Sequence, residues 1–363
     1  DTGDDGDRNS LETHAANLRD YYDNHFSDPR QPDSNRFAWD PWYVNVGDGT
    51  NPGSDVDSNN DDNEDDDDDD DTYNQQQLVE GEREATEKQT QYSLKRIQTN
   101  SFFTEDDFST LVEEITKLSR SIGLTAITPP WLSLYLEGDL QNFHTDASHG
   151  PLAFVLTLSR EGDFEGGETM LLQPQIMDLW KGFDSSRGLE TGGIMRYIPP
   201  TPVGRCIAFD PRVPHGVNRV SGTRDPRRGR IVIHGWFDQP EVCFFGPWSD
   251  DGTVGTMNAM LDEAMQPLVG MLGGGEIGRV VGYLACKIEV DEDGYVRDVY
   301  GVCDTLQADW EDFRGVIGYD EADRPVLEDA VADVKLTIYE VLKNLYFEEG
   351  EDGRSVVVPF AFE

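Results

Sequence analysis

Between residues 131 and 238 the sequence consists of short runs of β-forming residues separated by turns, and this pattern limits the fold more than any other feature of the chain. The runs read WLSLYL, LAFVLTLS, TMLL, GRCIAFD and GRIVIHGWF. Repeated short strands of this kind favour a β-sandwich or a β-barrel. Residues 173–200 interrupt the runs with a long segment of mixed polarity, which we interpret as a loop or a lid over one opening.

Helical patterns occur on both sides of these strands. Residues 103–123 place apolar side chains at helical spacing, with Thr104 as the expected N-cap and Gly123 as the expected stop. Near the other end, residues 278–363 follow the order strand, turn, strand, helix, strand, with the helix over 324–347. The sequence therefore predicts a helix beside the β-rich region and a small α+β domain at the C-terminal end.

The chain has 72 acidic and 29 basic residues among 363, a formal net charge of -43. Most of this charge lies before residue 92 and after residue 248, so the β-rich middle is nearly neutral. Nucleic-acid binding is disfavoured, because phosphate contacts need clustered lysine and arginine. The run DDNEDDDDDDD within residues 46–91 has almost nothing to bury and repels itself, so we expect a disordered acidic insertion there.

Other features bear on the compartment and the redox state. No run of eighteen apolar residues exists, so no membrane span is expected and the protein should be soluble. The chain opens at Asp1, and no targeting segment can be read from it, which leaves the compartment open. Four cysteines without C-x-x-C spacing argue against a zinc site. A single bridge between Cys286 and Cys303 and four free buried thiols both remain open.

The stretch NFHTDASHG suggests a metal site. His144 and Asp146 are two residues apart, so on an extended strand their side chains point to the same side. A third ligand is available in FDPRVPHGVNRV, where His215 follows a β-rich run and a proline turn. Two histidines and one carboxylate on one face are the ligand set of non-haem Fe(II) oxygenases, with the remaining positions open. We predict His144, Asp146 and His215 as the metal ligands and catalytic centre.

A cosubstrate with a distal carboxylate also needs a fixed cation, because a guanidinium clamps a carboxylate through two parallel hydrogen bonds. Arg230 begins the strand RIVIHGWF and is the preferred candidate, whereas Arg224 lies in the turn SGTRDPRRG and is the alternative. Two further histidines lie close in sequence to the predicted site residues. We interpret His149, on a turn, and His234, on the inward face of the Arg230 strand, as structural residues.

Together these residues resemble the Fe(II)/2-oxoglutarate-dependent dioxygenases, especially the prolyl-4-hydroxylase-like branch and, within it, an algal and plant subgroup. The resemblance covers roughly residues 95–245 and implies that the triad binds Fe(II), that Arg230 holds the far carboxylate of 2-oxoglutarate and that Tyr135 donates its hydroxyl to 2-oxoglutarate. Ascorbate is a further candidate cofactor. Collagen-type prolyl hydroxylases carry lysine at the clamp, so the arginine is a departure. The matching pieces, in order, are Tyr135 and Gly138, His144 and Asp146, Gly166-Gly167-Glu168-Thr169, His215-Gly216-Val217, Arg230 and Trp236.

We therefore expect a β-rich α+β chain in which an acidic N-terminal segment, 1–35, precedes a double-stranded β-helix (jelly-roll) domain with flanking helices. That domain spans residues 36–248, and a linker over 249–277 joins it to the α+β domain over 278–363. Motifs of the last domain, IEVDEDGYV and VPFAF, faintly resemble the C-terminal domains of TonB- and AgmX-type proteins. That resemblance implies at most a protein-binding module.

The dioxygenase resemblance implies hydroxylation of a substrate with release of succinate and CO2. A prolyl or peptide substrate follows from the branch. Two alternatives stay open: a 2-oxoglutarate oxygenase that acts on a small molecule, which a closed lid at 173–200 favours, and a non-catalytic acidic adaptor that keeps the jelly-roll fold.

Overall fold

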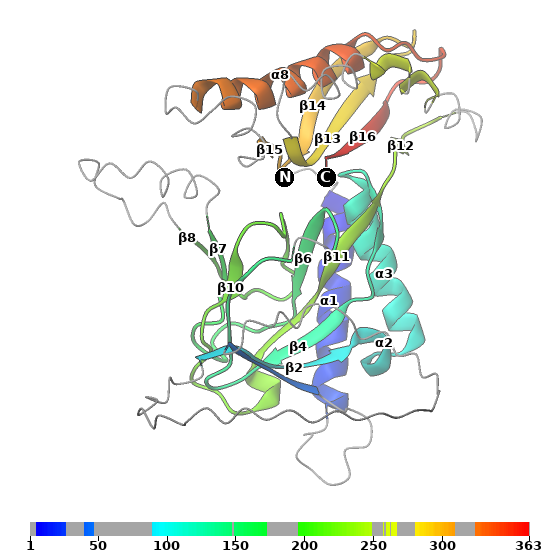
Figure 1. Cartoon of the computed structure of the whole chain (residues 1–363). Helices are drawn as coiled ribbons and strands as arrows, with labels where there is room; N and C mark the ends of the chain where they lie inside the picture. The colour runs from blue at the N-terminus through cyan, green and yellow to red at the C-terminus, as the bar shows by residue number, and fades with distance from the viewer. Residues whose placement is uncertain are drawn as a thin grey trace, which may run out of the picture.

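The computed structural model describes residues 5–26, 40–46, 89–146, 149–172, 195–248, 257, 259–261, 263–266, 280–308 and 324–362. These residues form two antiparallel sheets with helices packed against them (Figure 1). The larger sheet curls on itself in the manner of a jelly roll, and the smaller sheet carries one long helix. This arrangement confirms the predicted β-rich α+β class with a small C-terminal α+β unit.

The larger sheet contains eleven strands, and all of its pairings are antiparallel. Its hydrogen-bonded order is β8-β7-β10-β5-β2-β4-β11-β6-β9, with β1 paired to β2 and β3 paired to β11. The strands are β1 (Asp40–Val46), β2 (Gln89–Gln98), β3 (Leu124–Ile127), β4 (Trp131–Tyr135), β5 (Leu140–His144), β6 (Leu152–Thr157), β7 (Thr169–Leu172), β8 (Met195–Ile198), β9 (Cys206–Phe209), β10 (His215–Val217) and β11 (Arg230–Pro240). A 3-10 turn, η2 (Pro226–Arg228), precedes β11.

The two faces of this sheet differ in character because side chains alternate along a strand. On β4, Leu132 and Leu134 are fully buried in the main hydrophobic cluster, whereas Tyr135 belongs to a smaller cluster with Val232. The main cluster also takes in the helices, so it marks the outer face of the curled sheet. The smaller cluster marks the inner face, where the predicted site residues of β4 and β11 lie.

Three helices cover the outer face: α1 (Asp5–His25), α2 (Thr99–Phe102) and α3 (Glu105–Arg120). Helix α3 starts as predicted, because the Thr104 side chain accepts a hydrogen bond from the amide of Asp107. Gly123 follows its end with φ of +76°. Helix α1 was not predicted from the acidic segment 1–35. Its buried residues recur at helical spacing and join the main cluster; they are Leu11, Ala15, Leu18, Tyr22 and, just beyond, Phe26.

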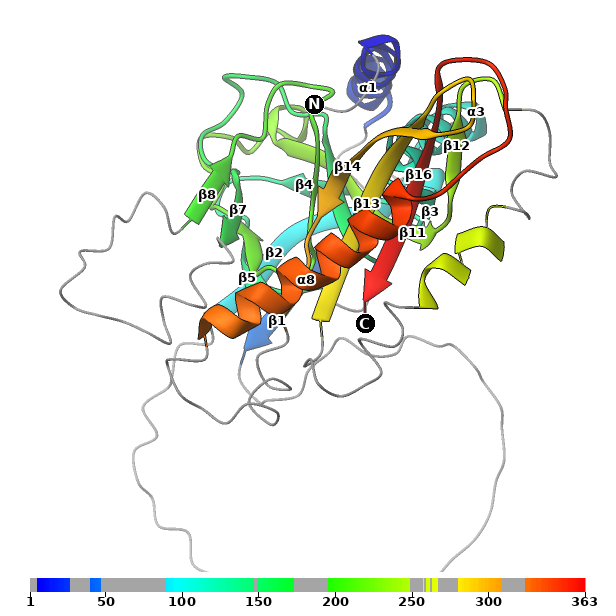
Figure 2. The ribbon, with the colours of Figure 1, turned by 90° about the horizontal axis from the view of Figure 1, so that it is seen from above.

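The smaller sheet has the order β12-β16-β13-β14, with β15 paired to β13. Its elements are β12 (Cys243–Phe245), β13 (Val280–Val290), β14 (Val296–Asp304), β15 (Gln307–Ala308), α8 (Arg324–Lys343) and β16 (Arg354–Phe362). Figure 2 shows α8 running across the strands of this sheet. Its buried residues Val334, Ile338 and Leu342 pack on one face of the sheet, in a second hydrophobic cluster. Tyr283 and Ala285, on the opposite face, belong to the main cluster of the larger sheet.

All four cysteines are free thiols, which answers the question about a disulfide. Cys286 pairs with Gly301 across the two strands, and Cys303 pairs with Ala285. Cys286 packs beside helix α8, whereas Cys303 packs against the main cluster on the other face of the sheet. The two thiols therefore point to opposite faces, which a disulfide cannot connect.

Several predicted segments lie outside the described residues. They include the acidic insertion, except its C-terminal end in β2, and the lid over 173–200, except β8. Much of the linker over 249–277 is also outside them, although Met257 and Leu261 are buried in the second cluster. No helix in the described parts of the chain is long and apolar enough to cross a membrane.

Candidate metal centre

Two neighbouring strands bring the predicted histidine ligands together. Strand β10 pairs antiparallel with β5, and in this register His215 lies directly opposite His144. Directly opposite residues of an antiparallel pair have their side chains on the same face of the sheet. The two imidazole rings consequently lie with their centroids 4.3 Å apart.

Asp146 completes the group just beyond the end of β5. Its carboxylate oxygens lie 3.7 Å from His144 Nε2 and 3.4 Å from His215 Nε2. One ligand atom from each of the three residues lies within 4.8 Å of the others. Ligand atoms about 2.1 Å from an ion at adjacent corners of an octahedron are about 3 Å apart. The two separations from Asp146 are therefore within about 1 Å of those between neighbouring ligands of an octahedral ion.

The tautomers of both histidines suit metal binding. His144 Nδ1 lies 2.9 Å from the backbone oxygen of Asn142, and His215 Nδ1 lies 2.9 Å from that of Val213. A carbonyl can only accept, so each Nδ1 must carry the proton and donate it. Each Nε2 then keeps a free lone pair directed toward Asp146. Hydrogen bonds of this kind orient metal-binding histidines in proteins, so the residues present fit a divalent metal ion.

The electrostatics of the group favour the metal-binding protonation states of His144 and Asp146. Burial, followed by the neighbouring His215, lowers the pKa of His144 below its ordinary value. Burial by itself would raise the pKa of Asp146, but the nearby histidines, His215 before His144, bring it below its usual range. A neutral imidazole and an ionised carboxylate are the forms that coordinate a cation.

Arg230 lies on the inner face of the larger sheet and is 2% exposed. Its Nε donates to the backbone oxygen of Gly167 at 2.7 Å, and its Nη2 donates to Thr169 Oγ1 at 3.2 Å. Both acceptors belong to the GGET segment. Within the described part of the chain no carboxylate forms an ion pair with Arg230, and burial lowers the pKa of its guanidinium. Glu168 is an acidic neighbour of this guanidinium but is not ion-paired to it, so the buried cation can take a ligand carboxylate. Arg224, by contrast, is exposed.

Tyr135 lies beside this arginine, since Arg230 is its partner across β4 and β11. The guanidinium carbon is 4.7 Å from the centroid of the tyrosine ring. The Tyr135 hydroxyl donates to Gln141 Oε1 at 3.0 Å. Arg230 and Tyr135 thus share one buried region of the inner face.

The two histidines interpreted as structural have defined partners. His234 Nε2 is hydrogen-bonded to Ser133 Oγ at 2.8 Å, and burial, reinforced by Arg96, lowers its pKa to about 4. The ring of His149 stacks on Trp236 with centroids 4.5 Å apart. The indole N–H of Trp236 is buried and has no hydrogen-bond partner among the described residues. This donor is therefore available to a ligand on the inner face.

Two aromatic residues at the metal group had no signal in the sequence. The Tyr92 ring meets the His144 ring edge-on at 5.0 Å, and the Phe209 ring meets the His215 ring at 4.8 Å. Burial and the charge of Asp146 raise the pKa of Tyr92. Neither residue belongs to a recognisable motif. Their position follows only from the pairing of β2 with β5 and from the short connection between β9 and β10.

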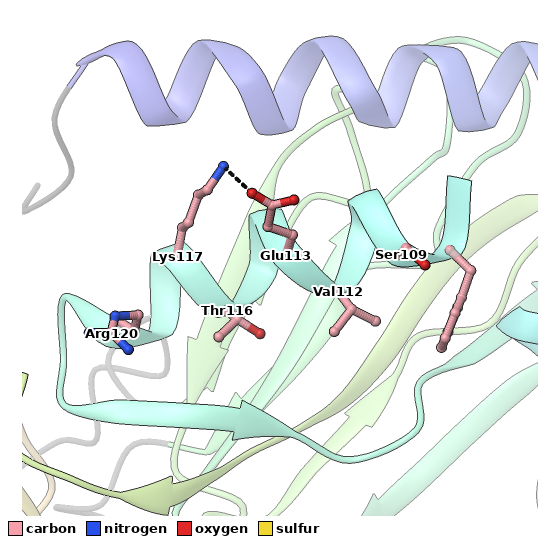
Figure 3. A pocket seen from close by; sticks show the side chains of 7 residues that line it. Ser109, Val112, Glu113, Thr116, Lys117 and Arg120 are labelled. Carbon is pink, nitrogen blue, oxygen red and sulfur yellow. Dashed lines mark ion pairs between the residues drawn. The ribbon is translucent and has the colours of Figure 1, made fainter. Parts of the chain in front are cut away.

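A separate surface pocket lies along helix α3 (Figure 3). Its lining is largely apolar, and Glu113 and Lys117 form an ion pair of 3.0 Å at its edge. Helix α3 covers the outer face of the larger sheet, whereas Arg230 and Tyr135 lie on the inner face. This pocket is therefore not part of the metal group. It is lined by Phe108, Ser109, Val112, Glu113, Thr116, Lys117 and Arg120.

Comparison with known proteins gives only distant similarities. No family model matches the chain, and no curated protein matches it. Among solved structures, a prolyl-4-hydroxylase from Pseudomonas putida is 18% identical, with 40% of this chain and 71% of that chain covered and a TM-score of 0.29. A 2OG-Fe(II) oxygenase family oxidoreductase from Burkholderia pseudomallei is 16% identical, with 40% and 64% covered and a TM-score of 0.29. The non-heme alpha ketoglutarate dependent epimerase SnoN from nogalamycin biosynthesis is 13% identical, with 40% and 60% covered and the same TM-score. Similarities this distant do not establish the family of this chain.

Proposed function

We propose that this protein is an Fe(II)- and 2-oxoglutarate-dependent dioxygenase. The observation that carries the proposal is the convergence of His144, Asp146 and His215 within 4.8 Å, with both Nε2 lone pairs free. Two histidines and one carboxylate on one face are typical of non-haem Fe(II) oxygenases. Arg230 adds a buried cation that forms no ion pair with a carboxylate among the described residues. The metal ligands and the carboxylate clamp of such an enzyme are thus both available on one sheet.

Each residue has a defined role in this proposal. Bound Fe(II) would supply the activation of O2, coupled to oxidative decarboxylation of 2-oxoglutarate to succinate and CO2 and to oxygen insertion into a substrate C–H bond. His144, His215 and Asp146 hold the ion by three positions and leave the others open. Arg230 binds the distal carboxylate of 2-oxoglutarate, and Tyr135, whose ring centroid lies 4.7 Å from the guanidinium carbon, donates its hydroxyl to 2-oxoglutarate. Ascorbate dependence stays a prediction.

Succinate formation tests the proposal directly. The protein is incubated without oxygen with Fe(II) and 2-oxoglutarate, O2 is admitted, and succinate is measured, including slow turnover without substrate. We expect iron-dependent succinate from the wild type and its loss in His144→Ala and Arg230→Ala. Arg224→Ala is the matched control, because it removes an exposed arginine of the preceding turn and should retain turnover.

Two results would contradict the proposal. A wild-type protein that forms no iron-dependent succinate is not an active dioxygenase, and this result would favour the acidic adaptor. Wild-type turnover in both His144→Ala and Arg230→Ala would mean that the site lies elsewhere.

For the substrate, the resemblance of the motifs to the prolyl-4-hydroxylase branch makes proline-containing peptides the first class to test. Stimulation of succinate formation and the gain of one oxygen atom in the peptide mass are the readouts. Small molecules are the second class.

A further inference from the structure

The loop between β9 and β10, residues 210–214, holds two of the proposed metal ligands through its backbone. The amide of Asp146 donates to the backbone oxygen of Pro211 at 2.8 Å. The Nδ1 of His215 donates to the backbone oxygen of Val213 at 2.9 Å. The positions of a carboxylate ligand and of an imidazole ligand therefore depend on the conformation of this one loop.

An ion pair between the buried Asp210 and the half-buried Arg212 stabilises that conformation. Asp210 is 8% exposed, and its Oδ1 accepts hydrogen bonds from the backbone N and from Nε of Arg212, both at 2.9 Å. Arg212 Nη2 donates to Asp210 Oδ2 at 2.5 Å. Arginine holds a carboxylate with two nitrogens in a fixed geometry, which a lysine cannot reproduce. This contact fixes the loop at Arg212, which lies between Pro211 and Val213, the two residues whose carbonyls hold the ligands.

The same guanidinium reaches into the smaller sheet. Arg212 Nη2 also donates to the backbone oxygen of Thr305, in the connection from β14 to β15, at 3.0 Å. Thr305 is itself fixed to β13, because its amide donates to Tyr283 O at 2.8 Å and its hydroxyl accepts from Tyr283 N at 2.9 Å. The Tyr283 hydroxyl in turn donates to the backbone oxygen of Ile122 at 2.5 Å. The acceptor for Arg212 is therefore tied to the smaller sheet and, through Tyr283, to the turn between α3 and β3.

Gly282 leaves the space that this contact needs. Its φ is +130°, and a Cβ there would lie 2.5 Å from Thr305 O and 2.9 Å from Arg212 Nη2. Any side chain at this position would push apart the donor and the acceptor. Gly282 therefore lies beside the contact between Arg212 and Thr305. Because Arg212 shapes the loop that holds the ligands, this contact links the smaller sheet to the metal group.

We propose that Arg212 is a positioning residue of the metal centre and that the smaller sheet, through Thr305 and Gly282, is a structural part of that centre. The inference rests on the proposed function, since it assumes that His144, Asp146 and His215 hold a metal ion. Ligands must be held to within about 0.5 Å of the productive geometry. Loss of the groups that orient metal ligands typically lowers metal affinity by about 10- to 100-fold.

Binding of Co(II), a spectroscopic substitute for Fe(II), tests the proposal without turnover. The metal-free full-length protein is titrated with Co(II), and the affinity and the visible ligand-field spectrum are recorded. We expect Arg212→Gln to bind Co(II) about 10-fold more weakly, with a changed spectrum. Arg212→Lys keeps the charge beside Asp210, so its Co(II) affinity should lie between those of the wild type and Arg212→Gln. The control is Arg297→Gln, which removes an exposed ion pair between Arg297 on β14 and Asp352. This variant should match the wild type.

A second variant approaches the contact from the smaller sheet. Gly282→Ala should weaken Co(II) binding in the same direction as Arg212→Gln. Its control is Gly353→Ala, since Gly353 also has a positive φ, +85°, but a Cβ there meets nothing within 4 Å. The comparison separates backbone strain from displacement of Arg212. If Arg212→Gln does not fold, this pair of glycine variants tests the positioning role instead.

The outcomes are distinct. Weaker Co(II) binding and a changed spectrum in Arg212→Gln and Gly282→Ala, with unchanged controls, support the positioning role. Wild-type affinity and spectrum in these two variants overturn it and leave the dioxygenase proposal intact. An equal loss in Arg297→Gln and Gly353→Ala also overturns it, because the effect is then general destabilisation. A wild-type protein that binds no Co(II) refutes the metal centre itself, and the positioning role with it.

Discussion

The substitution Gly167→Ala tests how closely the GGET segment packs around Arg230. Gly167 has φ of +72°, and its backbone oxygen accepts the Nε hydrogen bond of Arg230. A Cβ at this position would lie 3.0 Å from Arg230 Cδ, 2.9 Å from Phe164 Cε2 and 3.2 Å from Val220 Cγ2. All three separations are shorter than ordinary carbon contacts of about 3.5–4.0 Å. The arginine must therefore move by several tenths of an ångström.

Gly162 separates this crowding from backbone strain. Its φ is +79°, nearly that of Gly167, but a Cβ there meets nothing within 4 Å. Both alanine variants carry a left-handed backbone cost of about 1–2 kcal/mol. Overpacking adds about 1–3 kcal/mol in Gly167→Ala alone. If about 1.4 kcal/mol of this cost is lost from the binding free energy between Arg230 and 2-oxoglutarate, the ligand binds about tenfold more weakly.

Calorimetric titration of the Co(II)-loaded protein with 2-oxoglutarate measures this effect without turnover. We expect Gly167→Ala to raise the Kd of 2-oxoglutarate about tenfold and Gly162→Ala to leave it unchanged. Equal 2-oxoglutarate affinity in two folded variants would refute the assignment of Arg230 as the clamp, because its position would then not matter for binding.

Three further predictions follow from the buried groups. His234 has a pKa lowered to about 4 by burial and by Arg96. The unfolded chain therefore takes up this proton below about pH 6.5 and the folded chain does not, so stability should fall by roughly 3 kcal/mol between pH 6.5 and 4. Urea unfolding should show a shallower pH dependence in His234→Gln, and an identical dependence would contradict this account. Tyr283→Phe removes the hydroxyl bond to Ile122 and should lower the unfolding free energy by about 1 kcal/mol. Co(II) affinity should be retained, because the backbone bonds between Tyr283 and Thr305 remain; a loss of Co(II) affinity would mean that the bond to Ile122 also positions the ligand loop. Alkylation of the denatured, unreduced protein should label all four cysteines, and fewer labels in the mass spectrum would indicate a disulfide.

Much of the fold could be predicted from local patterns. The runs WLSLYL and LAFVLTLS form β4 and β6, because alternating or continuous apolar residues between turn signals favour strands. Thr104 caps α3 because its side chain satisfies a free amide of the first turn, which is a local interaction. Helix α1 escaped prediction because its charged residues dominate the composition of the segment. The role of its apolar residues is visible only in the structure, where they pack in the main cluster.

The candidate site could be predicted only in part. The spacing of His144 and Asp146 and the motif order pointed to the ligand set and to Arg230. Tyr92 could not be found, because it reaches His144 through the pairing of β2 with β5. The Arg212 contact with Thr305 could not be predicted from the sequence either, because the two residues lie in loops of different sheets.

The sequence by itself determined the chemistry that is available: two histidines and a carboxylate, a basic residue on a strand, glycines for tight turns and an acidic surface. The tertiary structure decided which of these groups meet. Strand register places His215 opposite His144, and a shift by one residue would turn the side chains of that strand to the other face. The same sheet buries Arg230 on β11, whereas Arg224, in the preceding turn, is exposed. Register depends on contacts between residues far apart in the chain, which no local pattern of amino acids encodes.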